Sequence, residues 1–257
     1  MPPAEWTYIE SGEQTGAFNM ALDESMARAL AVGEGYPVLR LFRWRPWAIS
    51  LGHNQAAGDI DAARCAADGI DVVRRPTGGR AILHAEELTY SVVMPAGRRS
   101  ILQVYNEISA ALVWGLSLYG VEVALQKSQP DFAKEYRSSS SVPCFASSAR
   151  YEIEWRGRKL VGSAQRRFSG PAGDVVLQHG SILCGDAHIR LAEYLSAPLD
   201  GARDSIRAAL RAKTADLRMI TGEPVRMNDL GGSIRRGFEE TWGLAFAPPA
   251  HFTTQMA

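Results

Sequence analysis

Three β-like segments follow one another between residues 151 and 183, and they constrain the fold more than any other part of the sequence. The first, Tyr151–Trp155, is joined by the short turn Arg156-Gly-Arg158 to a second at 159–166. A third, Val175–Leu183, follows the turn Gly170-Pro-Ala-Gly173. Because such short turns connect only antiparallel neighbours, the pattern predicts a β-hairpin extended into a meander.

The rest of the chain mixes strand and helix patterns. Val38–Trp44 alternates apolar and polar residues and ends at Arg45-Pro46, and Ala48–Gly52 is expected to be its neighbouring strand. Further strands are predicted at Gly69–Val73, Leu88–Met94 and Val121–Leu125. Helices are predicted at Asn19–Leu30, Asp59–Asp68, Ile101–Leu118 and Asn228–Trp242, the last with Phe238 and Trp242 facing the core. The fold class is therefore α+β, with mixed β-sheets flanked by helices.

Composition limits the partners and the compartment. The 257 residues contain 28 Lys and Arg and 28 Asp and Glu, so no net charge favours nucleic acid or an acidic membrane. The longest mostly apolar stretch, Ile108–Val121, is shorter than the roughly 18 residues that cross a bilayer, and the start MPPAEWTYIE does not resemble a secretion signal. We expect residues 1–257 to form a single catalytic domain, cytoplasmic and monomeric.

The cysteines do not form a disulfide or zinc pattern. Cys65, Cys144 and Cys184 are odd in number and far apart, so free thiols are expected, and a small buried apolar role is the default for each. Cys144 differs because it follows Pro143 and the serine-rich segment 126–143, which we predict to be a long surface loop. To act as a nucleophile, it would need a cation or base such as Lys159 or His179 nearby.

The block Arg74-Arg-Pro-Thr-Gly-Gly-Arg80 is the first candidate for ligand binding. Its glycines permit close approach of a ligand, and its arginines could donate forked hydrogen bonds to an anion. Taken alone, however, the block reads as an ordinary glycine turn with solvated arginines, because it is neither a Walker loop nor GxGxxG.

Polar residues also interrupt the second and third strands of the predicted meander. Lys159 precedes the small residues of Gly162-Ser163-Ala164; buried there, it could polarise an acyl carbonyl, although composition favours a lysine that projects into water. Gln178, His179 and Gly180 break an apolar run and need hydrogen-bond partners or a function. For His179 and for His84, a satisfied structural role is the alternative, and their spacing gives no HExxH metal motif.

Taken together, these stretches resemble the lipoate-protein ligase and octanoyltransferase family. The resemblance covers roughly residues 8 to 185. It rests on five ordered blocks: Phe18–Glu24, Arg74–His84, Glu87–Ser91, Gly157–Gln165 and Leu177–Leu183. It implies the catalytic-domain fold that lipoate ligases share with biotin protein ligases. One departure is Ala85, which stands after His84 where the family commonly has an acidic residue, and Glu86 or Glu87 could compensate.

Within the family, Ser141-Val-Pro-Cys-Phe145 is similar to the cysteine-bearing loop of LipM-type octanoyltransferases. The resemblance implies that Cys144 and Lys159 are catalytic. It also implies transfer of an octanoyl or lipoyl group from acyl carrier protein, through a Cys144 thioester, to a lysine of a lipoyl-domain protein, such as glycine cleavage H protein or the E2 subunit of 2-oxoacid dehydrogenases. No cofactor or metal is then needed. The acyl or substrate site would comprise Arg75, Thr77, Gly78, Gly79, His84, Gly162, Ser163, Ala164, Gln178, His179 and Gly180.

The same motifs are compatible with three other functions. An ATP-dependent lipoate-protein ligase would use Mg-ATP to form lipoyl-AMP, with Lys159 on the adenylate and Cys144 incidental. Many such ligases continue into an accessory domain, whereas about 70 residues follow Leu183 here. An amidotransferase would move acyl groups between carriers with the same thiol and lysine. A non-catalytic lipoyl-domain binder would retain the acyl pocket without turnover.

Overall fold

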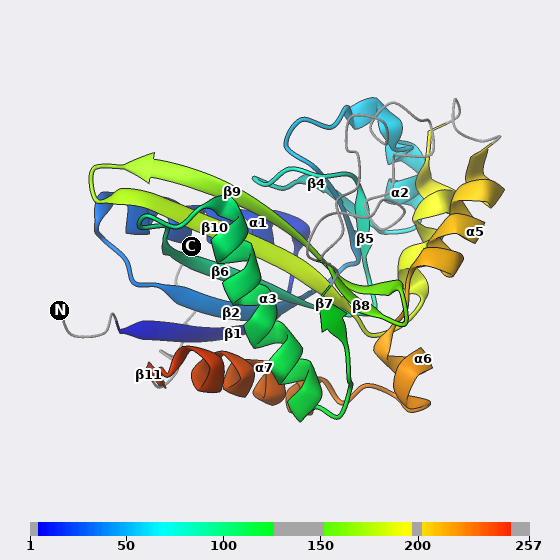
Figure 1. The fold of residues 1–257 in the computed structure, drawn as a ribbon. Coiled ribbons are helices and arrows are strands. Elements are labelled where there is room, and N and C mark those ends of the chain that lie inside the picture. Colours follow the sequence, from blue (N-terminus) through cyan, green and yellow to red (C-terminus); the bar gives the residue numbers. More distant parts are fainter. Residues whose placement is uncertain (1–4, 126–151, 197–201, 248–257) are drawn as a thin grey trace.

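The computed structural model describes residues 5–125, 152–196 and 202–247, and within these residues the larger sheet has eight strands. Their order is β11-β1-β2-β6-β10-β9-β8-β7, with β1, β2 and β11 parallel to one another and the other pairings antiparallel (Figure 1). The strands are β1 Trp6–Gln14, β2 Val38–Trp44, β6 Glu87–Pro95, β7 Ala124–Leu125, β8 Ile153–Trp155, β9 Arg158–Gly170, β10 Gly173–Leu183 and β11 Phe246–Ala247.

Helices cover both faces of this sheet. On one face α1 (Gly16–Val32) packs Ala27, Leu30 and Ala31 against Val93 and Leu177. On the other, α3 (Ile101–Leu118) and α7 (Met227–Trp242) pack together and against the sheet (Figure 1). Strand residues alternate between the faces, so neighbouring residues of β2 and β10 contribute to different layers. This alternation determines which polar side chains of these strands face the cavity.

Local signals fix the ends of these helices. The Thr15 side chain accepts a hydrogen bond from the Phe18 amide at the start of α1, and Gly33 ends the helix in the left-handed conformation at φ 85°. Ser100 and Gln103 form a capping box at the start of α3. Because α1 begins and ends at fixed residues, its buried polar side chains reach defined positions above the sheet.

A smaller sheet lies beside the large one, with strands in the order β4-β3-β5. The expectation that Ala48–Gly52 pairs with Val38–Trp44 was wrong: β3 belongs to this smaller sheet because β2 is already paired with β1 and β6 on its two sides. The elements around it are β3 Ala48–Leu51, η1 Ala57–Asp59, α2 Ala62–Ala67, β4 Asp71–Arg74, β5 Ile82–His84, η4 Ala187–Tyr194, α5 Arg203–Lys213 and α6 Leu217–Thr221.

The structure confirms the predicted fold class and the meander. Strands β8, β9 and β10 pair antiparallel in sequence order, and the long helix predicted at Ile101–Leu118 has those bounds. Phe238 is fully buried and packs edge-on against Trp242, with ring centroids 4.9 Å apart. The predicted loop 126–143 lies outside the described residues. Within the described part of the chain, no helix combines the length and apolarity needed to cross a membrane.

Candidate active site

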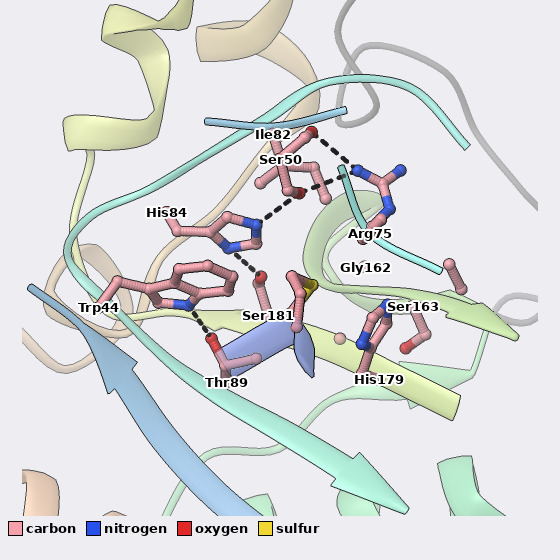
Figure 2. Close-up of a pocket in the computed structure, with 13 residues that line it drawn as sticks. Trp44, Ser50, Arg75, Ile82, His84, Thr89, Gly162, Ser163, His179 and Ser181 are labelled. Carbon is pink, nitrogen blue, oxygen red and sulfur yellow. Dashed lines mark hydrogen bonds between the residues drawn. The ribbon is translucent and has the colours of Figure 1, made fainter. Parts of the chain in front are cut away.

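A cavity lies where the large sheet, α1 and the smaller sheet meet (Figure 2). Side chains with hydroxyl, imidazole and guanidinium groups share the lining with small residues of β9, and the surface open to the cavity is largely apolar. Residues proposed from the sequence and found in the lining are Arg75, His84, Gly162, Ser163, Ala164, His179 and Gly180. The cavity therefore gathers parts of all five sequence blocks, from Met20 to Ser181.

Sequence reasoning missed six residues of the lining. They are Met20, Trp44, Ser50, Ile82, Thr89 and Ser181. Met20, Ile82, Thr89 and Ser181 belong to the sequence blocks that carry the family resemblance, so their positions could have been marked. No sequence signal distinguished Trp44 or Ser50, because each sits in an ordinary strand pattern.

The Arg74–Arg80 loop is held by its own arginines, so the interpretation of a turn with solvated arginines was wrong for Arg75, which is buried, although Arg74 is exposed. Arg75 is 3% exposed and donates from Nη1 to the Ser50 carbonyl and hydroxyl at 2.9 and 3.0 Å. Its other nitrogens donate to the carbonyls of Gly78 and Arg80. Arg74 donates to three further carbonyls, those of Gly52, His53 and Gln55. These hydrogen bonds direct both guanidinium groups to the protein backbone and define the shape of the loop.

Two glycines allow the loop to lie against the smaller sheet. Gly79 has φ 95°, which side-chain-bearing residues rarely adopt. A Cβ on Gly52 would come within 2.0 Å of the Gly79 carbonyl oxygen, so this contact admits no side chain. Gly78 and Gly79, both proposed as ligand-binding residues, are absent from the described cavity lining and act here through the backbone of the loop.

His84 lies at the centre of a buried hydrogen-bonded chain. Its Nδ1 is 2.8 Å from Glu87 Oε1 and its Nε2 is 2.7 Å from Ser50 Oγ, while the Trp44 ring stacks on the imidazole with centroids 4.0 Å apart. Burial raises the pKa of the Glu87 carboxyl, but the contacts with His84, Thr89 and Ser181 together outweigh it and leave that pKa below the ordinary value. An ionised Glu87 can only accept, so His84 donates from Nδ1.

The family departure at Ala85 is compensated by one of the two expected glutamates. Glu87 reaches His84, whereas Glu86 forms an ion pair with Arg218 on the surface. Glu87 Oε1 also accepts hydrogen bonds from the Thr89 and Ser181 hydroxyls at 2.6 and 2.7 Å. The acid partner of His84 is therefore supplied by the start of β6.

The order Ser50–His84–Glu87 matches the connectivity of a serine nucleophile, a base and an orienting acid. Ser50 nevertheless has no exposed surface and its oxygen accepts a hydrogen bond from Arg75. A nucleophile must reach its substrate with an available lone pair. The geometry therefore favours a positioning role, in which the Glu87–His84–Ser50 chain holds Arg75.

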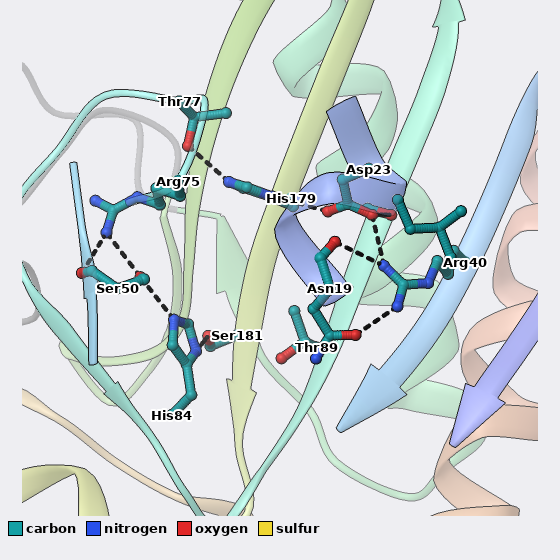
Figure 3. Close-up of polar contacts among 12 residues, drawn as sticks. Asn19, Asp23, Arg40, Ser50, Arg75, Thr77, His84, Thr89, His179 and Ser181 are labelled. Carbon is teal, nitrogen blue, oxygen red and sulfur yellow. Dashed lines mark hydrogen bonds and ion pairs between the residues drawn. The ribbon is translucent and has the colours of Figure 1, made fainter. Parts of the chain in front are cut away.

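His179 forms a second buried chain on the other side of the loop (Figure 3). Its Nε2 is 2.6 Å from Thr77 Oγ1 and its Nδ1 is 3.0 Å from Asp23 Oδ2. Burial lowers the pKa of the His179 imidazole, more than the nearby Asp23 raises it. A neutral imidazole beside a carboxylate carries its proton on Nδ1, so Nε2 accepts from the Thr77 hydroxyl. Thr77 is thus buried behind the cavity wall and contacts His179.

Gln178 lies on the opposite side of β10 from His179, because successive strand residues alternate faces. Its side chain donates to Tyr90 Oη at 3.0 Å and accepts from Gln165, and it does not line the described cavity. Tyr90 in turn contacts the Ser163 hydroxyl at 2.6 Å. Gln178 therefore belongs to a polar network with Gln165 and Tyr90 that reaches the cavity through Ser163.

Lys159 is buried, contrary to the projection into water that composition favoured. Its side chain is 5% exposed and forms an ion pair with Glu152, whose side chain is 2% exposed. A buried lysine is stable when its charge is matched, and Glu152 provides the match. Lys159 is not among the residues that line the described cavity, but it lies on the same strand as Gly162, Ser163 and Ala164.

The described cysteines are buried in the core. Cys65 and Cys184 are free thiols, and burial raises the pKa of Cys65 to about 11 and that of Cys184 to about 12. Both stay protonated at neutral pH and are poor nucleophiles. Cys144 lies outside the described residues. Among the residues that are described, no group of His, Cys, Asp and Glu could hold a metal ion.

We expect the free energy of unfolding to fall as the pH drops from 6.5 to 5, because buried histidines must gain a proton on unfolding. His179 and His188 both have a pKa below 6.5 in the fold, chiefly through burial, so the unfolded chain binds more protons in this window. Each contributes a slope of at most about 1.4 kcal/mol per pH unit, reached where the unfolded histidine is protonated and the folded one is not. Urea unfolding across this range should give a shallower slope for His179→Gln, and an equal slope would contradict the neutral assignment.

Comparison with known proteins places the chain in a family. The profile of the lipoyl protein ligase A/B catalytic domain matches residues 15–239. The octanoyltransferase LipM of Kyrpidia tusciae is 38% identical over 95% of this chain and 89% of its own length, and that of Symbiobacterium thermophilum is 36% identical over 95% and 88%. The chain belongs to the lipoyl protein ligase A/B catalytic domain family.

Solved structures agree with this fold. The bipartite lipoate protein ligase of Thermoplasma acidophilum, described with its lipoyl domain, superposes with a TM-score of 0.75 at 22% identity over 95% of this chain and 86% of its own. A lipoate-protein ligase A bound with ATP superposes with a TM-score of 0.72 at 21% identity, over 95% and 87%. At this level of identity the likeness establishes the α+β fold of lipoate ligases.

Proposed function

We propose that this chain is an acyltransferase that moves an octanoyl group from acyl carrier protein to a lysine of a lipoyl-domain protein. The observation that carries the proposal is its identity of 32–38% to octanoyltransferases LipM over at least 91% of the chain. The solved ligases are only 21–22% identical, so they support the fold and do not favour the ATP-dependent activity. We further propose one catalytic domain over residues 1–257, cytoplasmic and monomeric.

The proposed reaction has two transfers. The Cys144 thiolate attacks the octanoyl thioester, forming a thioester on Cys144 and releasing the carrier's thiol. The amine of the lipoyl-domain lysine then attacks that thioester, forms an amide and returns the Cys144 thiol. Two thioester-level steps replace one direct transfer, and no nucleotide or metal is consumed. Cys65 and Cys184 are buried with raised pKa values, which leaves Cys144 as the candidate nucleophile.

The described residues are suited to binding the acyl chain and to stabilising the oxyanion. The cavity and its small β9 residues provide a site for the acyl chain, with Arg75, His84 and His179 at its polar wall. Lys159 supplies a buried positive charge on β9, the strand that also holds Gly162, and we propose that it stabilises the oxyanion that develops in each transfer. Four other predicted residues lie outside the lining and position its elements. Thr77, Gly78 and Gly79 hold the loop, and Gln178 links strands of the sheet.

Intact-mass spectrometry with octanoyl-acyl carrier protein and no ATP tests this function. We expect an adduct of one octanoyl group on the full-length protein, removed by hydroxylamine because thioesters are labile to it. Adding a glycine cleavage H protein or an E2 lipoyl domain should discharge the adduct onto the carrier. A Cys65→Ala protein is the matched control and should still be labelled.

Other outcomes identify the alternative activities. Lipoyl-domain modification only with lipoate and Mg-ATP would make the chain a ligase. Labelling only by an already acylated carrier domain would make it an amidotransferase. Binding of a lipoyl domain without labelling by either donor would indicate a non-catalytic binder.

A further inference from the structure

Asp23, a residue outside the cavity lining, connects the fully buried Arg40 to the Arg74–Arg80 loop (Figure 3). It projects from α1 and has no exposed surface. One carboxylate oxygen, Oδ1, accepts from Arg40 Nη1 and from Ser91 Oγ, each at 2.8 Å. The other, Oδ2, faces His179 Nδ1 at 3.0 Å. One carboxylate oxygen of Asp23 therefore contacts Arg40 and Ser91, and the other contacts His179.

Arg40 keeps the carboxylate charged despite its burial. The guanidinium is itself fully buried, and Asn19 supplies two further acceptors through its carbonyl and side-chain oxygens. An isolated buried carboxylate would take up a proton, whereas one paired with a guanidinium and hydrogen-bonded stays ionised. An ionised Asp23 can only accept, so it requires a proton on His179 Nδ1.

The proton on His179 Nδ1 determines which hydrogen bond holds the Arg74–Arg80 loop. With Nδ1 protonated, His179 Nε2 has a lone pair toward Thr77 and accepts its hydroxyl proton at 2.6 Å. Thr77 lies two residues after Arg75, which the Glu87–His84–Ser50 chain holds from the smaller sheet. The loop is thus fastened at two points by two carboxylate–imidazole–hydroxyl chains that start on different elements.

We propose that Asp23 is a positioning residue for acyl transfer: through the Nδ1–H tautomer of His179 and the Thr77 hydroxyl, it fixes the loop that borders the acyl cavity. The part that concerns catalysis rests on the proposed function, whereas the tautomer does not. Misplacement of a site loop impairs the reaction after the substrate has bound, so loss of Asp23 acts on kcat more than on KM.

The tautomer is measured by two-dimensional proton–nitrogen NMR of ¹⁵N-histidine-labelled protein at pH 7, with His179→Gln used to assign the resonances. The expected result for His179 is a protonated Nδ1 and an unprotonated Nε2. In Asp23→Asn the amide can donate to Nδ1, so the proton should move to Nε2. Ser91→Ala removes a hydrogen bond to the other carboxylate oxygen and should leave the Nδ1–H tautomer in place.

Kinetics with octanoyl-acyl carrier protein and a lipoyl domain test the consequence. Asp23→Asn is expected to lower kcat by about 10- to 100-fold with KM changed less than about threefold. Because Asp23→Asn also removes the counter-charge of Arg40, Thr77→Val provides a second route. It replaces the hydroxyl by a methyl group of similar size, should lower kcat by a similar factor, and should add little when combined with Asp23→Asn.

Three results would overturn the proposal. The first is a wild-type His179 protonated on Nε2, and the second is an unchanged tautomer in Asp23→Asn. The third is full kcat in Thr77→Val. A wild-type protein with the expected tautomer but no transfer from acyl carrier protein would instead refute the octanoyltransferase function and leave the Asp23–His179–Thr77 chain as described.

Discussion

Cys144→Ala should lose octanoyl transfer by more than about 1,000-fold, because removal of the proposed nucleophile would eliminate the acyl-enzyme route and leave only binding and charge stabilisation. The same protein should show no octanoyl adduct by intact mass. The rate is measured as octanoyl-lysine formed on a lipoyl domain, with octanoyl-acyl carrier protein as the donor and no ATP.

Cys65→Ala is the control for this prediction, because it removes a different thiol. Cys65 and Cys184 are buried, with pKa values of about 11 and 12, so Cys65→Ala should keep at least a third of the wild-type transfer rate. If Cys144→Ala retained substantial lipoate attachment with Mg-ATP, the chain would be an adenylating ligase and its thiol incidental. A comparable loss in Cys65→Ala would indicate damage to the fold.

Lys159→Ala should cause the second largest change, in both stability and activity. It leaves Glu152 buried without its ion-pair partner Lys159, and removal of one member of a buried pair costs about 3–5 kcal/mol. Loss of a preorganised positive charge near the acyl site should also lower transfer by about 100-fold or more. Urea unfolding measures the first effect and steady-state transfer the second.

A double variant separates these two effects. Lys159→Met with Glu152→Gln removes both charges, so it should recover a large part of the lost stability, since neither ion is then left without its counter-charge. Activity should not recover, because no cation remains. Recovery of transfer in the double variant would show that Lys159 acts only through folding.

Patterns with a fixed period allowed most of the fold to be predicted. The meander of β8, β9 and β10 and the bounds of α3 follow from strand alternation, turn residues and a helical apolar stripe. The placement of β3 was wrong because its sequence shows only that it is a strand. Which sheet it joins depends on β2 already having β1 and β6 as partners, and that is a property of the whole fold.

For the candidate site, some residues were predicted correctly from the sequence, whereas the burial of others was not. His84, His179 and the small residues of β9 were found because polar or small residues interrupt apolar strands. Arg75 and Lys159 were identified, but their burial was not, because it depends on which side chains pair with them in the fold. Ser50 pairs with Arg75 from another strand, and Glu152, just before β8, pairs with Lys159. The burial of Asp23 was not predicted, because an acidic residue in an amphipathic helix is expected to face solvent.

The buried pair of Arg40 and Asp23 limits how related sequences can diverge. Replacing either residue alone leaves an unmatched charge in the interior, which is strongly destabilising, whereas replacing both by well-packed neutral residues is tolerated far better. A lineage that abandons this pair must therefore cross a low-stability intermediate or change both positions almost together. Position 40 on β2 and position 23 on α1 should consequently covary as a unit, and His179 should change its hydrogen-bonding partner wherever they do.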